Sequence, residues 1–204
     1  MIALYIVIAY LLGCIPFGLL AGKMKGLDIR QHGSGNIGTT NVFRVCGKSL
    51  GIVVFMLDVL KGIVPVLIAK QAVQDPNVGE GLQPILAGVF AILGHNFPVW
   101  LKFKGGKGIA TSAGVLGGLL PWTLLVAVIT WIGFFMATRY VSVASILAAV
   151  SLPITTAVLT YRSDGLPTAY LVFTLIIALL AIWQHRSNIQ RLRAGKENRF
   201  VRKS

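Results

Sequence analysis

The segment Gly33–Arg44, GSGNIGTTNVFR, combines glycines with hydroxyl, amide and guanidinium side chains. Glycines let backbone N–H groups approach an anion, and an arginine can bind phosphate oxygens through two donors. The glycine spacing matches a dinucleotide-binding fingerprint, but that motif needs a preceding strand and a βαβ unit, which this apolar sequence does not offer. The segment predicts a phosphate or carboxylate site, the alternative being a tight amphipathic turn on a membrane surface. The candidate residues are Gly33, Ser34, Gly35, Asn36, Thr40, Asn41 and Arg44.

A second glycine-rich, cationic segment is FKGGKGIAT at 103–111, which follows GHNFP at 94–98. It matches a Walker A loop only loosely, because Gly108 rather than Ser or Thr follows Lys107, so nucleotide hydrolysis is not expected. Such a turn at the start of a helix can still bind an anion, through N–H groups, the positive end of the helix dipole and a lysine. The alternative is a lysine cluster that sets membrane topology. The candidate residues are Lys104, Gly105, Gly106, Lys107 and Gly108.

The third polar segment is divided between YVSVAS at 140–145 and HRSNIQRLR at 185–193. His185 and Asn188 are three residues apart and share one face if this stretch is helical. Taken alone, either stretch is more typical of an interfacial anchor with a basic tail than of a functional site. The candidate residues are Ser142, His185 and Asn188.

The absence of several residue types limits the reactions that these segments could catalyse. Asp28 and Glu197 are the only acidic residues near these segments, which argues against a carboxylate-bound two-metal site. There is no G-x-S-x-G elbow, no clustered His/Cys ligand set, and no His-x4-Asp arrangement of the common glycerolipid acyltransferases. We therefore expect no metal and no cofactor. The remaining chemistry is transfer between two phosphate-bearing substrates, driven by positioning and charge stabilisation.

The hydropathy pattern indicates which elements position these segments. Of 204 residues, 55 % are hydrophobic and 12 % are charged, whereas soluble domains carry about 25 % charged residues. A soluble fold of this size cannot bury so much apolar surface, so lipid is the expected solvent for much of the chain. Pro121 divides the long stretch 108–138 into a helical hairpin. The predicted spans are 1–22, 49–69, 81–101, 107–120, 121–138, 141–160 and 166–184.

The basic residues indicate the orientation of these spans. With the N-terminus outside, the inner segments hold 16 of the 19 Lys and Arg residues, a strong positive-inside bias that a six-span model would break. The net charge of +13 then reports topology and contact with anionic lipid headgroups, without any nucleic acid. We predict an all-α integral membrane protein in one polytopic domain, with seven transmembrane helices, the N-terminus outside and the C-terminus cytoplasmic. The predicted cytoplasmic motif loops are 30–48, 94–111, 139–145 and 185–204.

Two features lie within the predicted spans. Asp58 and Lys61 are one helical turn apart, and charges inside a span normally pair or line a cavity. They are interpreted either as a structural pair or as residues beside the active cavity. Ala110, Gly114 and Gly118 recur every fourth residue, which is typical of close helix packing.

In order, the three polar segments resemble the three cytoplasmic motifs of the bacterial acyl-phosphate:glycerol-3-phosphate acyltransferase family, and length and hydropathy agree over the whole chain. The resemblance implies a multi-pass enzyme of the bacterial inner (plasma) membrane whose active site faces the cytoplasm. Such an enzyme moves a fatty acyl group from acyl phosphate to the 1-hydroxyl of glycerol 3-phosphate, giving lysophosphatidic acid and phosphate, in the first acylation step of phospholipid synthesis. The enzyme that makes acyl phosphate and the next acyltransferase would be its functional partners.

The resemblance also implies roles for the candidate residues. Ser34 and Arg44 belong to the essential first motif, the glycines around Lys107 to the motif associated with glycerol 3-phosphate binding, and Ser142, His185 and Asn188 to a polar wall. Because acyl phosphate is already activated, no covalent acyl-enzyme is required and Ser34 is not assigned as a nucleophile. Ser34, Thr40, Asn41 and Arg44 would orient phosphate oxygens, and Lys107 would neutralise charge.

Two questions stay open on the sequence. The hydroxyl proton could pass to His185 or to a phosphate oxygen of the acyl donor. A transporter or flippase for an anionic metabolite or lipid is the alternative function, because discontinuous helices whose ends face an anion are typical of transporters. Against it, the sequence shows no internal repeat, and its polar residues gather at one face of the membrane.

Overall fold

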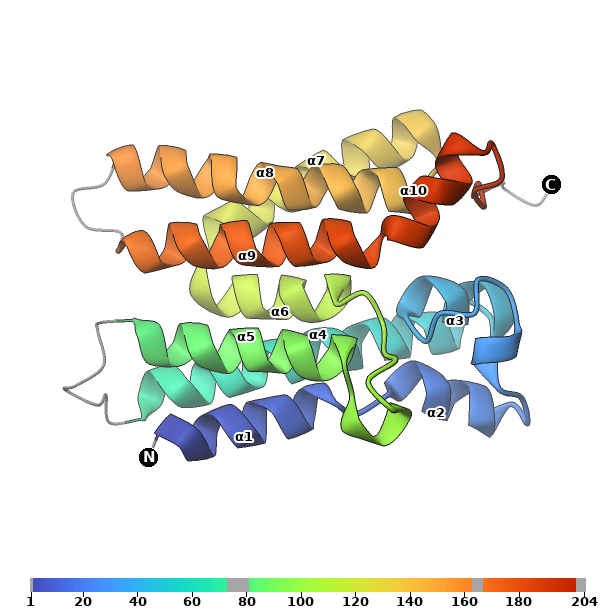
Figure 1. Cartoon of the computed structure of the whole chain (residues 1–204), viewed down its shortest axis with the longest axis horizontal. Helices are drawn as coiled ribbons and strands as arrows, with labels where there is room; N and C mark the ends of the chain where they lie inside the picture. Colours follow the sequence, from blue (N-terminus) through green and yellow to red (C-terminus); the bar gives the residue numbers. More distant parts are fainter. Residues whose placement is uncertain (1, 73–80, 163–166, 201–204) are drawn as a thin grey trace. The chain divides into compact units, whose positions relative to one another are not determined.

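The computed structural model describes residues 2–72, 81–162 and 167–200, and every regular element in these ranges is helical. The all-α prediction is confirmed. The chain divides into two compact units, Met1–Leu119 and Leu120–Ser204, which are described separately (Figure 1).

The first unit is a helical bundle. In it, α4 packs against α5 and α6, and α1 packs against α5 (Figure 1). The segments between the long helices carry short helical elements, which occupy part of the predicted loops 30–48 and 94–111. The elements are α1 (Ile2–Gly13), α2 (Phe17–Met24), η1 (Ile29–Gln31), α3 (Thr39–Val45), α4 (Lys48–Gln71), α5 (Leu82–Asn96), η2 (Val99–Leu101) and α6 (Ile109–Leu119).

Glycines allow α4 and α6 to approach closely. A Cβ atom added to Gly114 would overlap the backbone oxygen of Val59, and one added to Gly118 would lie 2.7 Å from a methyl carbon of Val66. On the facing helix, Gly62 lies equally close to the α6 backbone. The predicted role of Gly114 and Gly118 in helix packing is confirmed.

The first apolar stretch is interrupted rather than continuous. The segment Ile2–Met24, which contains α1 and α2, has 23 residues and is long and apolar enough to span a membrane, but the helix breaks before Pro16. Proline has no N–H group, and its ring clashes with the carbonyl of the residue four positions earlier. The predicted span 1–22 therefore exists as two helices joined at a proline.

Side chains from elsewhere in the unit satisfy the carbonyls that this break exposes. The indole N–H of Trp100 donates to the Cys14 carbonyl oxygen at 2.8 Å, and Nζ of Lys61 donates to the Ile15 carbonyl oxygen at 2.8 Å. Nζ of Lys61 also lies 2.8 Å from Oδ1 of Asp58 in a buried ion pair. The predicted pairing of Asp58 and Lys61 is confirmed.

The second unit consists of α7 (Pro121–Thr138), α8 (Val141–Arg162), α9 (Thr168–Gln184) and α10 (Arg186–Arg193). Helix α8 packs against both α7 and α9. Pro121 occupies the first turn of α7, where its missing N–H costs nothing, and α10 bends away from α9 by 52°. The N–H of Phe200 donates to the Arg139 carbonyl at 2.9 Å, which brings the basic tail back to the turn between α7 and α8.

The helix lengths bear on the predicted number of spans. Five segments are long and apolar enough to cross a membrane, and α9 with α10 forms a bent sixth. The predicted break at Pro121 is confirmed, because α6 ends before it and α7 begins at it, but α6 has only 11 residues, about 16 Å of helix. The structure therefore supports five to six spans by length. The loops predicted outside fall mainly on 73–80 and 163–166, beyond the described residues.

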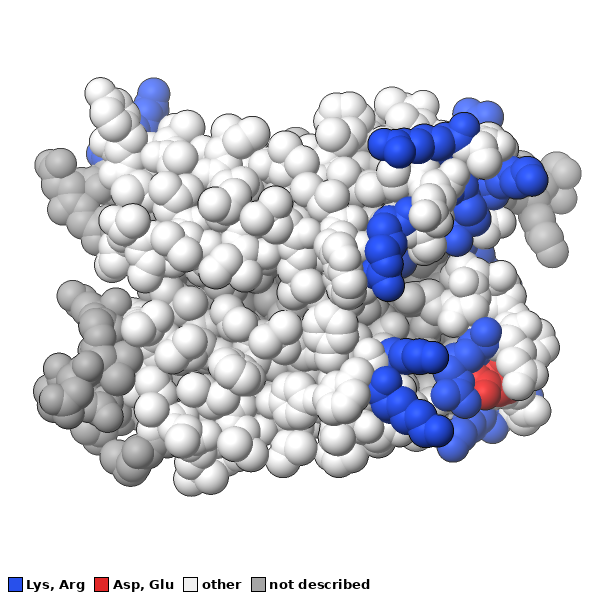
Figure 2. Space-filling view, in the orientation of Figure 1, with Lys and Arg blue, Asp and Glu red and all other residues white. Residues whose placement is uncertain are grey.

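Polar and apolar surfaces are separated within each unit. Figure 2 shows Lys and Arg gathered at the α2–α3 end of the first unit and around α10 in the second. Along the helices, large apolar side chains are exposed, among them Leu4, Trp122 and Met136, each more than 60 % accessible. Extensive exposed apolar surface of this kind fits contact with lipid.

Gly114→Ala tests the close packing of α4 and α6. Its methyl group would meet backbone rather than a movable side chain, so we expect the free energy of unfolding to fall by about 1–3 kcal/mol. The matched control is Gly133→Ala in α7, where nothing lies within 4 Å of the added methyl; it should be neutral or stabilising by about 0.5–1 kcal/mol. The measurement is thermal unfolding in detergent, and equal midpoints for both variants would contradict this packing.

Candidate phosphate-binding site

The first segment forms a loop between η1 and α3. Gly33 and Gly35 adopt left-handed backbone angles, with φ of 61° and 71°, which residues with a side chain rarely adopt. Oδ1 of Asn36 accepts the N–H of Gly38 at 2.8 Å, immediately before the first turn of α3. Asn36 thus helps to end the loop, and its role as a phosphate ligand stays a prediction.

Asn41 holds this loop from inside. Its side chain is 1 % exposed. Oδ1 accepts the N–H of Ser34 at 2.8 Å, and Nδ2 donates to the carbonyls of Ile29 at 3.2 Å and His32 at 3.0 Å. Because both amide hydrogens are used, the structure gives Asn41 a positioning role in place of the predicted contact with phosphate.

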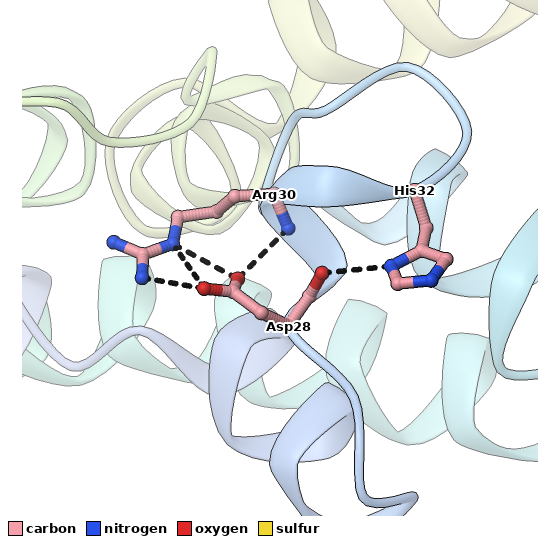
Figure 3. A network of polar contacts seen from close by, with 3 residues as sticks. All are labelled: Asp28, Arg30 and His32. Atoms are coloured by element: carbon pink, nitrogen blue, oxygen red, sulfur yellow. Dashed lines mark hydrogen bonds and ion pairs between the residues drawn. The ribbon is translucent and has the colours of Figure 1, made fainter.

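An exposed ion pair precedes the loop. Arg30 binds Asp28 through Nε at 2.9 Å and Nη2 at 2.6 Å, and Nδ1 of His32 lies 2.9 Å from the Asp28 carbonyl oxygen (Figure 3). The hydrogen bond from Arg30 lowers the pKa of Asp28 to about 2. Arg30 therefore belongs to the loop's own structure at neutral pH.

The other three predicted ligands of this segment lie at the start of the glycine loop and on α3. Thr40 and Arg44 lie four residues apart on α3 and so share a face. Arg44 is exposed, and Ser34 is half-buried at the start of the glycine loop.

The second segment is tied to the C-terminal end of α5. The N–H of Gly105 donates to the Asn96 carbonyl at 3.0 Å, and the N–H of Gly106 donates to the His95 carbonyl at 3.1 Å. These two N–H groups are therefore used within the protein, contrary to their predicted use in binding an anion. Glycine is required at both positions because the loop lies close to His95, and a Cβ atom on either residue would overlap His95.

The rest of this loop leads into α6. Gly108 has a left-handed backbone with φ of 77°, and a Cβ there would come within 2.6 Å of Oδ1 of Asn96. Lys107 is half-buried, whereas Lys104 is exposed. These two lysines are the cations that the loop provides.

Buried polar atoms beside this loop lack hydrogen bonds. Among the described residues, neither polar atom of the Asn96 amide has a partner, and neither does Oγ1 of Thr111. Buried polar groups are normally hydrogen-bonded. A polar group of a bound substrate could satisfy these atoms.

The first two segments are linked within their unit by one apolar cluster. Ile29, Ile37 and Val42 belong to this cluster, and Leu101 of η2 packs against it. The third segment belongs to the second unit.

Glu197 organises the third segment. Oε1 accepts the Ser142 hydroxyl at 3.0 Å and Nδ2 of Asn188 at 2.7 Å, while Oε2 accepts Nε of Arg191 at 2.8 Å. Burial raises the pKa of Glu197, but these hydrogen bonds outweigh burial and hold the pKa below its ordinary value. The structure thus brings Ser142 and Asn188 together as predicted, through a carboxylate that was not among the predicted site residues. In the sequence, Glu197 stands out as a single acidic residue within a strongly basic tail.

His185 lies at the bend between α9 and α10 and is 2 % exposed. Nδ1 lies 2.8 Å from the Ala181 carbonyl oxygen. Because a carbonyl only accepts, this contact places the proton of a neutral ring on Nδ1 and leaves Nε2 as the acceptor. In this tautomer a neutral His185 can accept a proton at Nε2.

The acidic and sulfur side chains do not form a metal cluster in the described part of the chain. No group of three His, Cys, Asp or Glu side chains there lies close enough to hold an ion. Metal-free transfer remains a prediction.

Comparison with known proteins agrees with the motif resemblance. A family model described as glycerol-3-phosphate acyltransferase matches residues 3–195. The chain belongs to this family. Relatives named glycerol-3-phosphate acyltransferase include those of Geobacter metallireducens, 50 % identical with 94 % of each chain covered, and of Aquifex aeolicus, 45 % identical with 97 % of this chain and 99 % of the relative covered.

Two solved structures are also similar. One is the crystal structure of PlsY, an integral membrane glycerol 3-phosphate acyltransferase, in its glycerol 3-phosphate form; it is 42 % identical, has a TM-score of 0.89, and covers 98 % of this chain and 96 % of its own. The lysophosphatidic acid form of PlsY is 41 % identical, with a TM-score of 0.86 and coverage of 98 % and 95 %. This member of the glycerol-3-phosphate acyltransferase family is an integral membrane protein.

Glu197→Gln tests whether this carboxylate orders Ser142 and Asn188. The amide keeps the size but loses the charge that holds three donors. We expect kcat/KM for the acyl transfer of this family to fall about 10- to 150-fold, the range for a lost charged hydrogen bond of about 1.5–3 kcal/mol.

The control is Lys196→Gln, which removes a charge from the neighbouring exposed side chain and should leave kcat/KM within about twofold. Because the folded pKa of Glu197 is lowered, its stabilisation is present above the unfolded pKa and is lost as pH falls through the folded value. The difference between wild type and Glu197→Gln should therefore be constant from pH 6 to 8. A difference that varies over this range, or equal effects of both variants, would contradict this role.

Proposed function

We propose that the protein transfers a fatty acyl group from acyl phosphate to the 1-hydroxyl of glycerol 3-phosphate, releasing lysophosphatidic acid and inorganic phosphate. The observation that carries the proposal is the likeness over nearly the whole chain to PlsY, whose solved forms are named for glycerol 3-phosphate and lysophosphatidic acid. In the reaction, the hydroxyl oxygen bonds to the acyl carbon. The bond from that carbon to the phosphate oxygen breaks, and phosphate leaves with the electron pair.

The first and second segments supply the anion-binding groups in this proposal. Ser34, Thr40 and Arg44 orient phosphate oxygens, and Lys107 neutralises the charge that develops on the leaving phosphate. Asn41 acts indirectly, by fixing the backbone at Ser34. Because phosphate is a good leaving group, orientation and charge stabilisation suffice and no acyl-enzyme forms.

The hydroxyl proton has two candidate acceptors. The hydrogen bond between His185 and the Ala181 carbonyl supports Nε2 as a base. A phosphate oxygen of the acyl donor is the other candidate. Asn188 and Ser142, held by Glu197, complete the polar wall.

We also propose that the enzyme lies in the bacterial inner membrane, with seven spans and a cytoplasmic active site. In that arrangement the short helix α6 counts as one of the seven spans. The proposal is supported by the positive-inside bias of the sequence and by the basic ends of both units (Figure 2).

Purified protein in detergent, with acyl phosphate, glycerol 3-phosphate and EDTA, tests the function. We expect equal amounts of phosphate and lysophosphatidic acid, with EDTA having no effect. Arg44→Lys keeps the charge but loses the planar fork, so substrate use should weaken about 10- to 150-fold. Arg30→Lys is the matched control, because Arg30 is engaged by Asp28.

Absence of product from wild-type protein would overturn the proposal. Activity that is lost on addition of EDTA and restored by Mg²⁺ would contradict the metal-free part of the mechanism. The assay also separates the enzyme from a transporter, because no transport is possible in detergent.

Cysteine labelling tests the orientation. In a Cys46→Ser background, Lys70→Cys and Lys196→Cys each place one thiol at an exposed site. An impermeant maleimide added to intact cells should label position 70, and position 196 only after the membrane is opened. Equal labelling of both positions in intact cells would contradict the proposed topology.

A further inference from the structure

Three buried ionisable side chains of the first unit take no part in the proposed reaction. Lys61 and Asp58 form an ion pair of 2.8 Å, and Nδ1 of His95 lies 3.7 Å from the same Asp58 oxygen. The three side chains are at most 6 % exposed. Charges buried in a membrane protein are costly and commonly functional, so a role for this cluster is expected.

The imidazole of His95 lies between this cluster and the glycine-rich loop. Nδ1 faces Asp58, whereas Nε2 lies where a Cβ of Gly106 would be. The N–H of Gly106 also donates to the carbonyl of His95 at 3.1 Å. One residue therefore supports Gly106 through both its backbone and its ring.

The cluster is fixed from the opposite side as well. Nζ of Lys61 donates to the Ile15 carbonyl at the break between α1 and α2. A continuous series of contacts thus runs from this break through Lys61, Asp58 and His95 to Gly106. Lys107 follows Gly106 directly, so the position of its backbone depends on this series.

We propose that His95, which lies beside the Asp58–Lys61 ion pair, is a positioning residue that fixes the Gly105–Gly108 loop and thereby sets the affinity for the phosphate of glycerol 3-phosphate. This inference depends on the proposed function, in which Lys107 faces a substrate phosphate. It assigns no catalytic chemistry to the buried cluster.

A double-mutant cycle between His95 and Gly106 tests the inference on the full-length enzyme. Gly106→Ala forces a methyl group against the imidazole, and we expect KM for glycerol 3-phosphate to rise at least tenfold while kcat changes less than threefold. His95→Ala alone should raise KM because the loop loses its support. In the double variant the methyl group occupies the vacated space, so KM should fall roughly 3- to 100-fold below that of Gly106→Ala.

Gly105→Ala is the matched control. Its methyl group would meet the backbone oxygen of His95 and the ring of Pro98, both of which remain after His95→Ala. We therefore expect no rescue for this pair. Independent, multiplicative effects of His95→Ala and Gly106→Ala on KM, or equal rescue of Gly105→Ala, would overturn the inference.

Asp58→Asn keeps the shape of the side chain but loses the charge that faces His95 and Lys61. This variant should also raise KM more than it lowers kcat. A change in kcat alone would contradict a positioning role. Thermal midpoints of the same cycle report the contact without activity: additive midpoints would refute it. Inactive wild-type protein would refute the proposed function, whereas active wild type with an additive cycle would refute only this inference.

Discussion

The ion pair between Lys61 and Asp58 stabilises the backbone at the helix break next to Pro16. Inside a membrane, every backbone polar group needs a partner within the protein, and the break at Pro16 takes the Ile15 carbonyl out of the regular helical hydrogen bonds. This carbonyl accepts the N–H of Phe17 at 3.1 Å and Nζ of Lys61 at 2.8 Å, and Asp58 neutralises the lysine. The helix can therefore break there, and the chain that carries the first glycine loop begins from this fixed point.

A similar pattern recurs at each polar segment. Groups from a neighbouring part of the same unit fix the segment through hydrogen bonds. Asn41 holds the loop at Ser34, the end of α5 holds the loop before Lys107, and Glu197 holds Ser142 and Asn188. An enzyme whose donor is already activated needs this kind of rigidity, because orientation and charge provide the rate acceleration.

The sequence was sufficient for features that depend on local pattern. Apolar length predicted the helices, Pro121 marked the boundary between α6 and α7, and the long motifs identified the family. Features that depend on distant contacts could not be derived. Glu197 meets a hydroxyl 55 residues away, and Lys61 meets a carbonyl 46 residues away. No local spacing distinguishes the amide of Asn41, which holds backbone, from one that would bind phosphate, and hydropathy alone did not show that α6 has only 11 residues.

In the proposed mechanism acyl transfer is direct, and the protein acts by position and charge. Isotope exchange tests it most directly: labelled inorganic phosphate and unlabelled acyl phosphate are incubated with active enzyme in the absence of glycerol 3-phosphate. An acyl-enzyme would form, release phosphate and react back with labelled phosphate, so label would enter acyl phosphate. Direct transfer predicts no labelled acyl phosphate above the enzyme-free rate and no added acyl mass on the protein. Rapid exchange, or an acyl group found on Ser34, would contradict the account.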